Sequence, residues 1–417
     1  MRFTGDQIEL CRRQFPALLR TVGQRPAVFL DGPAGTQVPH RVIDAVANYL
    51  AYTNANHEGA FVTAQESDRL LAEAHQAVAD LLGASDPACV CFGQNMTSLT
   101  FAFSRAVART WQPGDEIVVT RAEHDANFTP WVLAARDAGV TVRYADIRPD
   151  DCTLDLDDLS GKIGDRTRLV AVGGASNASG TINPMATVAE WAHRVGALVF
   201  VDAVHYAPHA LIDVNRLQCD ILVCSAYKFF GPHVGVLWAR RELLEKLPAY
   251  KVRPAPDSLP GKWMTGTQNH EGIAGTREAI DYLADLGRSL ADDQDLDRRA
   301  ALAEAFADIR EYEIELARHL LAGLAELPDF KVWGITDPAR LAERLPTVSI
   351  THHRVTATQL AARLGARGIF VWHGNYYALP LTERLGLEPE GMVRIGPVHY
   401  NTFDEIDRLI SELKNVD

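Results

Sequence analysis

One lysine of this chain lies between two mostly apolar runs that are typical of buried strands. Residues 220–224 come before Ser225 and Lys228, and residues 234–238 follow a Gly-Pro turn. Continuous apolar runs of this length predict strands buried on both faces, as in the largely parallel sheet of an α/β protein. A lysine at the end of such a strand loses hydration, which lowers its pKa and leaves a free amine that can attack an aldehyde. A lysine that simply extends its amine into solvent is the alternative.

A carboxylate at the end of another strand-like run favours the reactive lysine. Residues 197–201 are mostly apolar and lead to Asp202, which stands 26 positions before Lys228. An aspartate in that place is usually a turn residue or a helix N-cap. Open α/β sheets, however, bind ligands at the carboxyl ends of their strands, where we expect both side chains to lie. The pair suits pyridoxal phosphate, since a lysine can hold its aldehyde while an aspartate pairs with its pyridine nitrogen.

The sequences around these two residues resemble a known family. DAVH at 202–205 together with SAYK at 225–228 is similar to the motifs of the class V aminotransferase superfamily of fold-type I pyridoxal phosphate enzymes, especially its cysteine desulfurase/selenocysteine lyase branch. The likeness runs from about Val28 to the C-terminus. It implies an α/β fold with a large domain around a mainly parallel central sheet, and a smaller α+β C-terminal domain. The boundaries that we expect are 26–291 for the large cofactor-binding domain, and 1–25 with 292–417 for the small domain.

The resemblance also implies which residues bind pyridoxal 5'-phosphate. EHDAN at 123–127 is similar to the family segment whose histidine stacks on the pyridine ring, which implies that role for His124. A strand, a glycine and a helix start near Asn95 form a pattern that suits phosphate at a helix N-terminus, although a simple N-cap explains it too. Asn177 could likewise merely build an Asx turn. The implied cofactor-binding residues are Asn95, Met96, His124, Asn177, Asp202, His205, Ser225, Lys228 and, reaching the phosphate of a neighbouring subunit, Thr267.

Substrate contacts follow from the same resemblance. Arg394 lies in a segment that is similar to the one bearing the family's carboxylate-binding arginine. A guanidinium suits that role because it can clamp a carboxylate through two hydrogen bonds. Ala34, Asn177 and His57 match family positions near the substrate. A histidine in a surface loop is an equally good explanation of His57.

The chain departs from the desulfurase pattern at the residue that carries sulfur. Cysteine desulfurases use a nucleophilic cysteine in a loop of the C-terminal domain, and Tyr377 stands at the matching position. The chain has six cysteines, and none of them comes after Cys224. Trp372 stands where the family loop often has an arginine. The catalytic residues that we expect are Lys228, His124, Asp202 and Tyr377, without a metal ion.

These features predict a pyridoxal phosphate enzyme that acts on an amino acid or a related amine through an external aldimine. Desulfurase-like cleavage of a carbon–sulfur bond without a protein persulfide is the first choice of reaction. Transamination or epimerisation is the alternative, because the same cofactor chemistry serves all three. A non-catalytic scaffold relative is the alternative of another class. The joint presence of Lys228, Asp202, His124 and Arg394 argues against a scaffold.

Charge and composition narrow the classes of partner. Lys and Arg number 41 and Asp and Glu number 54, a formal net charge of −13 that argues against a nucleic-acid surface. No apolar stretch has the length of a membrane span or the form of a signal peptide, so we expect a cytoplasmic protein. The cysteines have no zinc-like spacing. By resemblance, Thr267 implies a homodimer with composite active sites. The resemblance also implies that the partner bound in these sites is a small amino-acid-like substrate.

Overall fold

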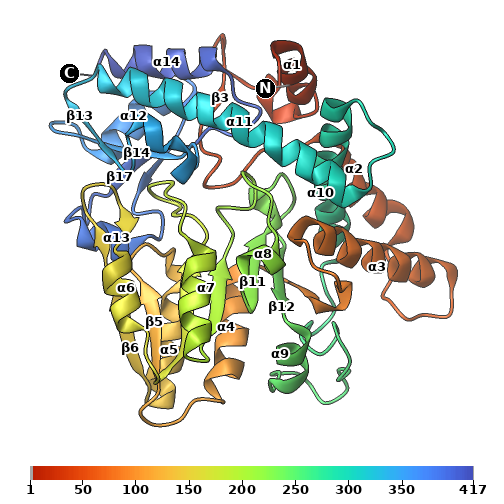
Figure 1. Ribbon diagram of the computed structural model, residues 1–417. Coiled ribbons are helices and arrows are strands. Elements are labelled where there is room, and N and C mark those ends of the chain that lie inside the picture. Colours follow the sequence, from red (N-terminus) through yellow and green to blue (C-terminus); the bar gives the residue numbers. More distant parts are fainter. Residues whose placement is uncertain (1–2, 417) are drawn as a thin grey trace.

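The computed structural model describes residues 3–416, and its centre is a seven-stranded sheet (Figure 1). The strand order is β4-β12-β11-β10-β9-β5-β6. Only β12 runs antiparallel to its neighbours, so the other six strands end at the same edge. The strands are β4 (Val90–Gly93), β5 (Glu116–Thr120), β6 (Thr141–Ala145), β9 (Thr167–Gly173), β10 (Leu198–Asp202), β11 (Ile221–Ser225) and β12 (Gly235–Ala239).

Helices cover the sheet, which explains why its strands are apolar along most of their length. Residues of β5 and β11 are buried throughout, as expected for strands with both faces covered. Helix α4 (Met96–Ala108) packs against α5 (Thr129–Ala138), and α7 (Met185–Arg194) packs on β9 and β10. Figure 1 shows α6 (Leu156–Lys162) and α7 in front of the sheet and α4 behind it.

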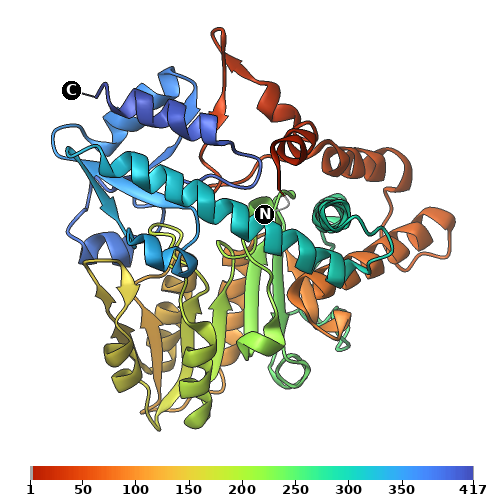
Figure 2. The same cartoon turned by 45° about the horizontal axis from the view of Figure 1, so that its top comes forward.

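A second sheet, antiparallel and four-stranded, is built by the C-terminal part of the chain. Its order is β13-β14-β17-β16. The long helix α11 (Arg298–Ala325) extends from α10 (His270–Ala291) to this sheet, as Figure 2 shows. A Cβ atom at Gly287 would lie 1.9 Å from the carbonyl oxygen of Ala301, so only glycine allows α10 and α11 to approach this closely. The elements of this part are β13 (Phe330–Trp333), β14 (Val348–His352), α12 (Ala357–Ala366), β16 (Trp372–Gly374), α13 (Leu379–Arg384), β17 (Met392–Ile395) and α14 (Phe403–Leu413).

The N-terminal segment pairs with the C-terminal part of the chain. Strand β3 (Val28–Phe29) pairs in parallel with β15 (Ile369–Phe370), and Asp31 bridges to Gly396. The first strand of the expected large domain therefore pairs with the C-terminal part of the chain, and the domain boundaries stay a prediction. No helix within residues 3–416 is long and apolar enough to cross a membrane. The remaining helices and strands are α1 (Gly5–Arg12), α2 (His40–Asn48), α3 (Val62–Leu82), α8 (Val214–Leu217), α9 (Arg241–Lys246), β1 (Thr21–Val22), β2 (Arg25–Pro26), β7 (Ile147–Arg148) and β8 (Thr153–Leu154).

Candidate active site

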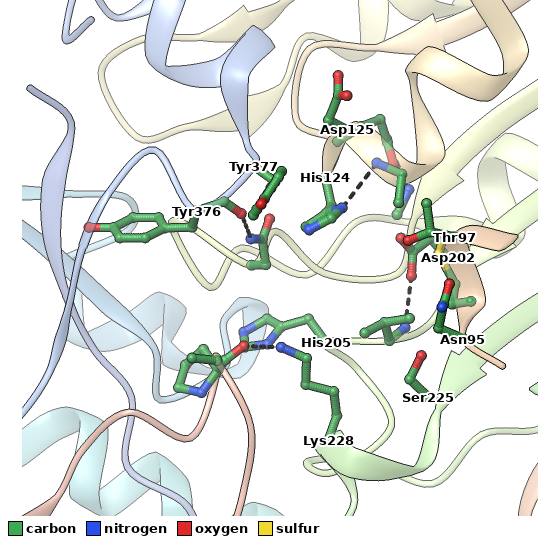
Figure 3. A pocket seen from close by; sticks show the side chains of 18 of the residues that line it. Asn95, Thr97, His124, Asp125, Asp202, His205, Ser225, Lys228, Tyr376 and Tyr377 are labelled. Atoms are coloured by element: carbon green, nitrogen blue, oxygen red, sulfur yellow. Dashed lines mark hydrogen bonds between the residues drawn. The ribbon is translucent and has the colours of Figure 1, made fainter. Parts of the chain in front are cut away.

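The carboxyl ends of the parallel strands open into a cavity of about 490 Å³ (Figure 3). Strand β10 ends at Asp202, β11 ends at Ser225, and Lys228 follows in a 3-10 helix. This is the edge at which open α/β sheets bind ligands. The predicted site residues that line the cavity are Ala34, Asn95, Met96, His124, Asn177, Asp202, His205, Ser225, Lys228, Tyr377 and Arg394.

Lys228 is buried in the cavity wall, and its amine donates a hydrogen bond to the carbonyl oxygen of Pro33. Burial, together with the positive charge of Arg394, lowers the pKa of this amine to about 7, against the opposing effects of Asp202 and Asp31. A large fraction of the amine is therefore unprotonated near neutral pH, where an ordinary lysine is almost wholly charged. This is the property that a nucleophilic lysine requires.

Asp202 places a buried carboxylate at the end of β10. Its Oδ1 accepts a hydrogen bond of 2.9 Å from the backbone N–H of Val204. Burial raises the pKa of Asp202 to about 6, although the Val204 N–H and the charge of Lys228 lower it. Three positions further on, His205 is held by a contact of 3.0 Å between its Nε2 and Oγ1 of Thr347. Asp202 can therefore share a proton with a basic nitrogen bound in the cavity.

The N-terminus of helix α4 provides a site for an anion. Met96 and Thr97 of its first turn line the cavity, and Ser225 adds a hydroxyl group. Backbone N–H groups in a first helical turn have no partners within the helix and favour phosphate. The side chain of Asn95 accepts a hydrogen bond of 2.8 Å from the N–H of Ser98, so it caps the helix. A Cβ at Gly235 would come within 2.3 Å of the Asn95 backbone, so this glycine lets β12 lie against the loop.

His124 is a neutral imidazole in the cavity wall. Burial lowers its pKa to about 4, and the positive charges of Lys228 and Arg394 lower it as well. Its Nδ1 accepts a hydrogen bond of 3.0 Å from the N–H of Ala126, which leaves the proton on Nε2. The ring lies nearly parallel to that of Tyr377, at 5.6 Å between centroids. A fixed, uncharged ring of this kind can stack on a heteroaromatic ligand.

Arg394 is buried on the side of the cavity that the C-terminal part of the chain forms. Its Nη1 donates a hydrogen bond of 2.8 Å to the carbonyl oxygen of Asn177, and its guanidinium lies 4.3 Å from the ring centroid of Tyr376. Arg394 Nε is buried without a hydrogen-bond partner. A buried guanidinium with an unpaired N–H favours a carboxylate ligand. The N–H has lost its hydrogen bonds to water, and a carboxylate would supply a charged acceptor in their place.

Comparison with known proteins agrees with this geometry. The family model described as Aminotransferase class-V matches residues 28–409. The chain belongs to the class-V aminotransferase family. It is 31% identical to a cysteine desulfurase of Pectobacterium atrosepticum over 98% of both chains.

Two solved structures extend the comparison to the fold. The apo cysteine desulfurase of Thermococcus onnurineus NA1 matches with a TM-score of 0.85 and 25% identity, over 97% of this chain and 96% of that one. A cysteine desulfurase of Escherichia coli matches with a TM-score of 0.83 and 27% identity, over 98% of this chain and 97% of that one. These structures confirm the α/β fold-type I architecture expected from the sequence.

Class-V aminotransferases and cysteine desulfurases are enzymes that depend on pyridoxal 5'-phosphate, so the expected cofactor and the expectation of an enzyme are confirmed. The cavity fits this group. It combines a buried amine of lowered pKa at Lys228, a carboxylate at Asp202 and a helix N-terminus at Met96. The Oδ1 atom of Asn177 is buried without a partner, which leaves an acceptor for a ligand hydroxyl.

A tightly held turn carries Tyr377 into the cavity wall. Tyr376 and Tyr377 both have positive φ, 56° and 60°. The carbonyl oxygen of Tyr376 accepts from Asn177 Nδ2 at 2.9 Å, and that of Tyr377 accepts from the N–H of Asp125 at 2.6 Å. The Tyr377 side chain itself is 72% exposed. The backbone of this turn is therefore fixed to the large sheet, while the phenol remains accessible to a ligand.

Two of the predicted site residues do not line the cavity of this chain. His57 lies in an exposed loop, where its ring is 5.9 Å from that of His270. Thr267 lies in an exposed segment before α10. Their assignments to the substrate and to a neighbouring subunit's phosphate stay predictions.

The sequence reasoning missed several residues of the cavity. Glu123 and Tyr376 line it, and the sequence motifs above assign no role to either. Glu123 precedes His124 in the EHDAN motif, and a carboxylate beside a buried strand was an available signal. No local pattern distinguishes Tyr376 from other tyrosines, because its role depends on contacts with Asn177 and Arg394.

Proposed function

We propose that this enzyme cleaves a carbon–sulfur bond of an amino-acid-like substrate by elimination, without forming a persulfide on the protein. The observation that carries the proposal is Tyr377 in the cavity wall, at the position where the desulfurase pattern has its cysteine. Transamination or epimerisation of the same class of substrate is the alternative. Identifying the reaction products distinguishes these reactions from elimination.

Pyridoxal phosphate, when bound, withdraws electrons from bonds at the α-carbon of an amino substrate. Lys228 would hold the cofactor aldehyde through its amine and, once displaced, carry a proton. Asp202 would pair with the pyridine nitrogen, and the neutral ring of His124 would stack on the pyridine. Arg394 would bind the substrate carboxylate and so orient the bonds at the α-carbon.

The cysteines of the chain support elimination over sulfur transfer to the protein. A persulfide relay needs a thiolate that reaches the substrate sulfur. All six cysteines are buried, and none is among the described residues that line the cavity. Cys224 is closest in sequence to Lys228, and its burial within β11 raises the pKa of its thiol far above the usual value. The Tyr377 phenol can donate a proton or a hydrogen bond, but it does not accept sulfur.

We expect no sulfur to accumulate on the protein during turnover. The purified enzyme is incubated with cysteine or a thioether amino acid in the absence of reductant, and its intact mass is measured together with sulfide, keto acid, amino-group exchange and racemisation. Elimination breaks the carbon–sulfur bond and releases the sulfur as sulfide or thiol, so an unmodified protein mass with these products is the expected result.

The variant Tyr377→Cys is the control for this measurement, because it restores a thiol at the accessible position in the turn. It should show that an added sulfur can be detected when a suitable cysteine is present. A stoichiometric, turnover-dependent addition of sulfur to the unaltered chain would contradict the proposal. Amino-group exchange or racemisation without sulfide would favour the alternative reactions.

We also infer a homodimer with composite active sites. Apolar side chains on α2, α3 and the segment between them are exposed, and large exposed apolar patches are typical of interfaces. Tyr52 is 77% exposed, Phe61 57% and Val62 66%. The exposed Thr267 matches the family segment that reaches the phosphate of a neighbouring subunit.

Light scattering at assay concentration should therefore give the mass of a dimer. Replacing Tyr52 and Phe61 together by glutamate should yield monomers with much lower activity, because a charge in an apolar interface is costly. A wild-type monomer with full activity would refute the inference.

A further inference from the structure

Glu123 is a buried carboxylate beside the cofactor cavity, and three donors converge on it. The side chain is 1% exposed. Oε1 accepts from Thr120 Oγ1 at 2.6 Å and from the Gly173 N–H at 2.9 Å. Oε2 accepts from Asn127 Nδ2 at 2.6 Å. Hydrogen bonds donated to a carboxylate stabilise its charged form.

The same contacts tie down both ends of the turn that carries His124. Thr120 is the last residue of β5, and its Oγ1 also accepts from the Ala122 N–H at 3.2 Å. Asn127 lies just before α5, and its Oδ1 accepts from Trp131 Nε1 at 3.2 Å. The Trp131 contact fixes which way the Asn127 amide points, so its N–H can only face Glu123. The turn therefore depends on a carboxylate at position 123.

Glu123 also lies next to Asp202, with only Gly173 between them. Gly173 is the register partner of Asp202 on the adjacent strand, and it donates its N–H to Glu123. A Cβ at position 173 would lie 3.1 Å from Glu123 Oε2, so the glycine leaves room for the second carboxylate. Burial and the charge of Asp202 raise the pKa of Glu123 to about 7, whereas the three donors lower it.

We propose that Glu123 is a positioning residue that fixes the His124 turn against the cofactor and adds a second negative charge behind Asp202. The proposal rests on the roles inferred above for His124 and Asp202. Such a charge acts among the titratable groups that line the cavity, which include His124, Asp202, His205, Tyr227, Lys228, Tyr376 and Arg394, with Asp31 close to Lys228 and Arg394.

The variant Glu123→Gln tests both proposed roles of Glu123, fixing the His124 turn and adding a negative charge behind Asp202. The amide introduced at position 123 would place an N–H opposite the side-chain N–H of Asn127, so two donors would face each other. The Asn127 amide cannot rotate to avoid this, because its oxygen accepts from Trp131 Nε1. Leaving such a buried donor unpaired should weaken the binding of pyridoxal phosphate by about tenfold or more, measured by titration of the stripped enzyme. The visible band of the bound cofactor changes when the nitrogen joined to Lys228 gains a proton. Its midpoint should move to lower pH in the variant, because Glu123, which carries a negative charge above its pKa of about 7, no longer favours the protonated form.

The double variant Glu123→Gln with Asn127→Asp should restore most of both properties. The amide introduced at position 123 would then donate to the carboxylate introduced at position 127. That carboxylate still accepts from Trp131, and the negative charge returns to nearly the same place. Asp220→Asn is the matched control: Asp220 is a buried carboxylate that accepts from the Val199 N–H at 2.7 Å, at the opposite end of β11 from Lys228. It should leave cofactor affinity and the midpoint unchanged.

Unchanged affinity and midpoint in Glu123→Gln would overturn the proposal, as would equal losses in Asp220→Asn or a double variant no better than the single one. These readouts do not depend on which bond of the substrate is cleaved. A failure of the proposed elimination reaction would appear in the products of the wild-type enzyme, whereas a failure of this proposal would appear in cofactor binding.

Discussion

Lys228→Ala is expected to abolish turnover and the visible absorbance of the covalently held cofactor, while the fold stays intact. Lys228 is the only lysine among the described residues that line the cavity, so no other amine there can take its place. Its amine is buried, and burial lowers the pKa of this amine to about 7. In the wild type, capture of added cofactor should consequently slow as the pH falls below about 7, because the amine becomes protonated. Absorbance spectra, circular dichroism and product assays check these expectations.

Lys262→Ala is the matched control for this variant. Lys262 has the same 8% exposure as Lys228, and its amine donates to the carbonyl oxygens of Leu244 and Glu245, away from the cavity. This variant should lose some stability but keep the visible band and the activity. Turnover at the wild-type rate in Lys228→Ala would remove the central assignment of the site.

The sequence predicted correctly those parts of the fold that depend on a short, continuous run of residues, such as a single buried strand. The apolar runs that lead to Asp202 and Lys228 form β10 and β11, which are neighbours in the sheet. Because parallel strands end at one edge, predicting the strands was enough to bring the two side chains together. The pairing of β3 with β15 could not be predicted in this way, because it joins residues more than 300 positions apart through two-residue strands without a distinctive pattern.

The same distinction holds for the site. Residues that end a strand or begin a helix, such as Asp202 and Met96, line the cavity, and their roles toward the cofactor stay predictions. The support around them comes from residues distant in sequence, such as the bond from Asn177 to Tyr376 and that from Lys228 to Pro33. Such contacts depend on tertiary packing, which a local pattern does not specify. Family resemblance partly filled this gap by indicating Arg394.

Asp202→Ala is expected to lower kcat by roughly 10²–10³-fold, the scale for removing one preorganised electrostatic partner. The carboxylate is buried, and it is fixed by the Val204 N–H at 2.9 Å. Without it, a pyridine nitrogen in the cavity has no acid with which to share a proton, and the cofactor becomes a weaker acceptor of electrons. Asp202→Asn should retain cofactor, since its amide oxygen can keep the Val204 contact, but it should still lose most of the activity. Steady-state kinetics at equal cofactor occupancy, set by absorbance, separates loss of chemistry from loss of binding.

Glu123 is the carboxylate with which Asp202 must be compared as a partner for the cofactor's pyridine nitrogen. Among the described residues that line the cavity, it is the other buried carboxylate, but its oxygens already accept hydrogen bonds from Thr120, Asn127 and Gly173. Glu123 is therefore expected not to replace Asp202. Compared at equal cofactor occupancy, Glu123→Gln should slow the Asp202→Asn enzyme less than it slows the wild type. Once the Asp202 carboxylate is gone, only the loss of support for the His124 turn remains. An Asp202→Ala enzyme at near the wild-type rate, with a further loss on Glu123→Gln, would instead mean that Glu123 is the acid that pairs with the cofactor.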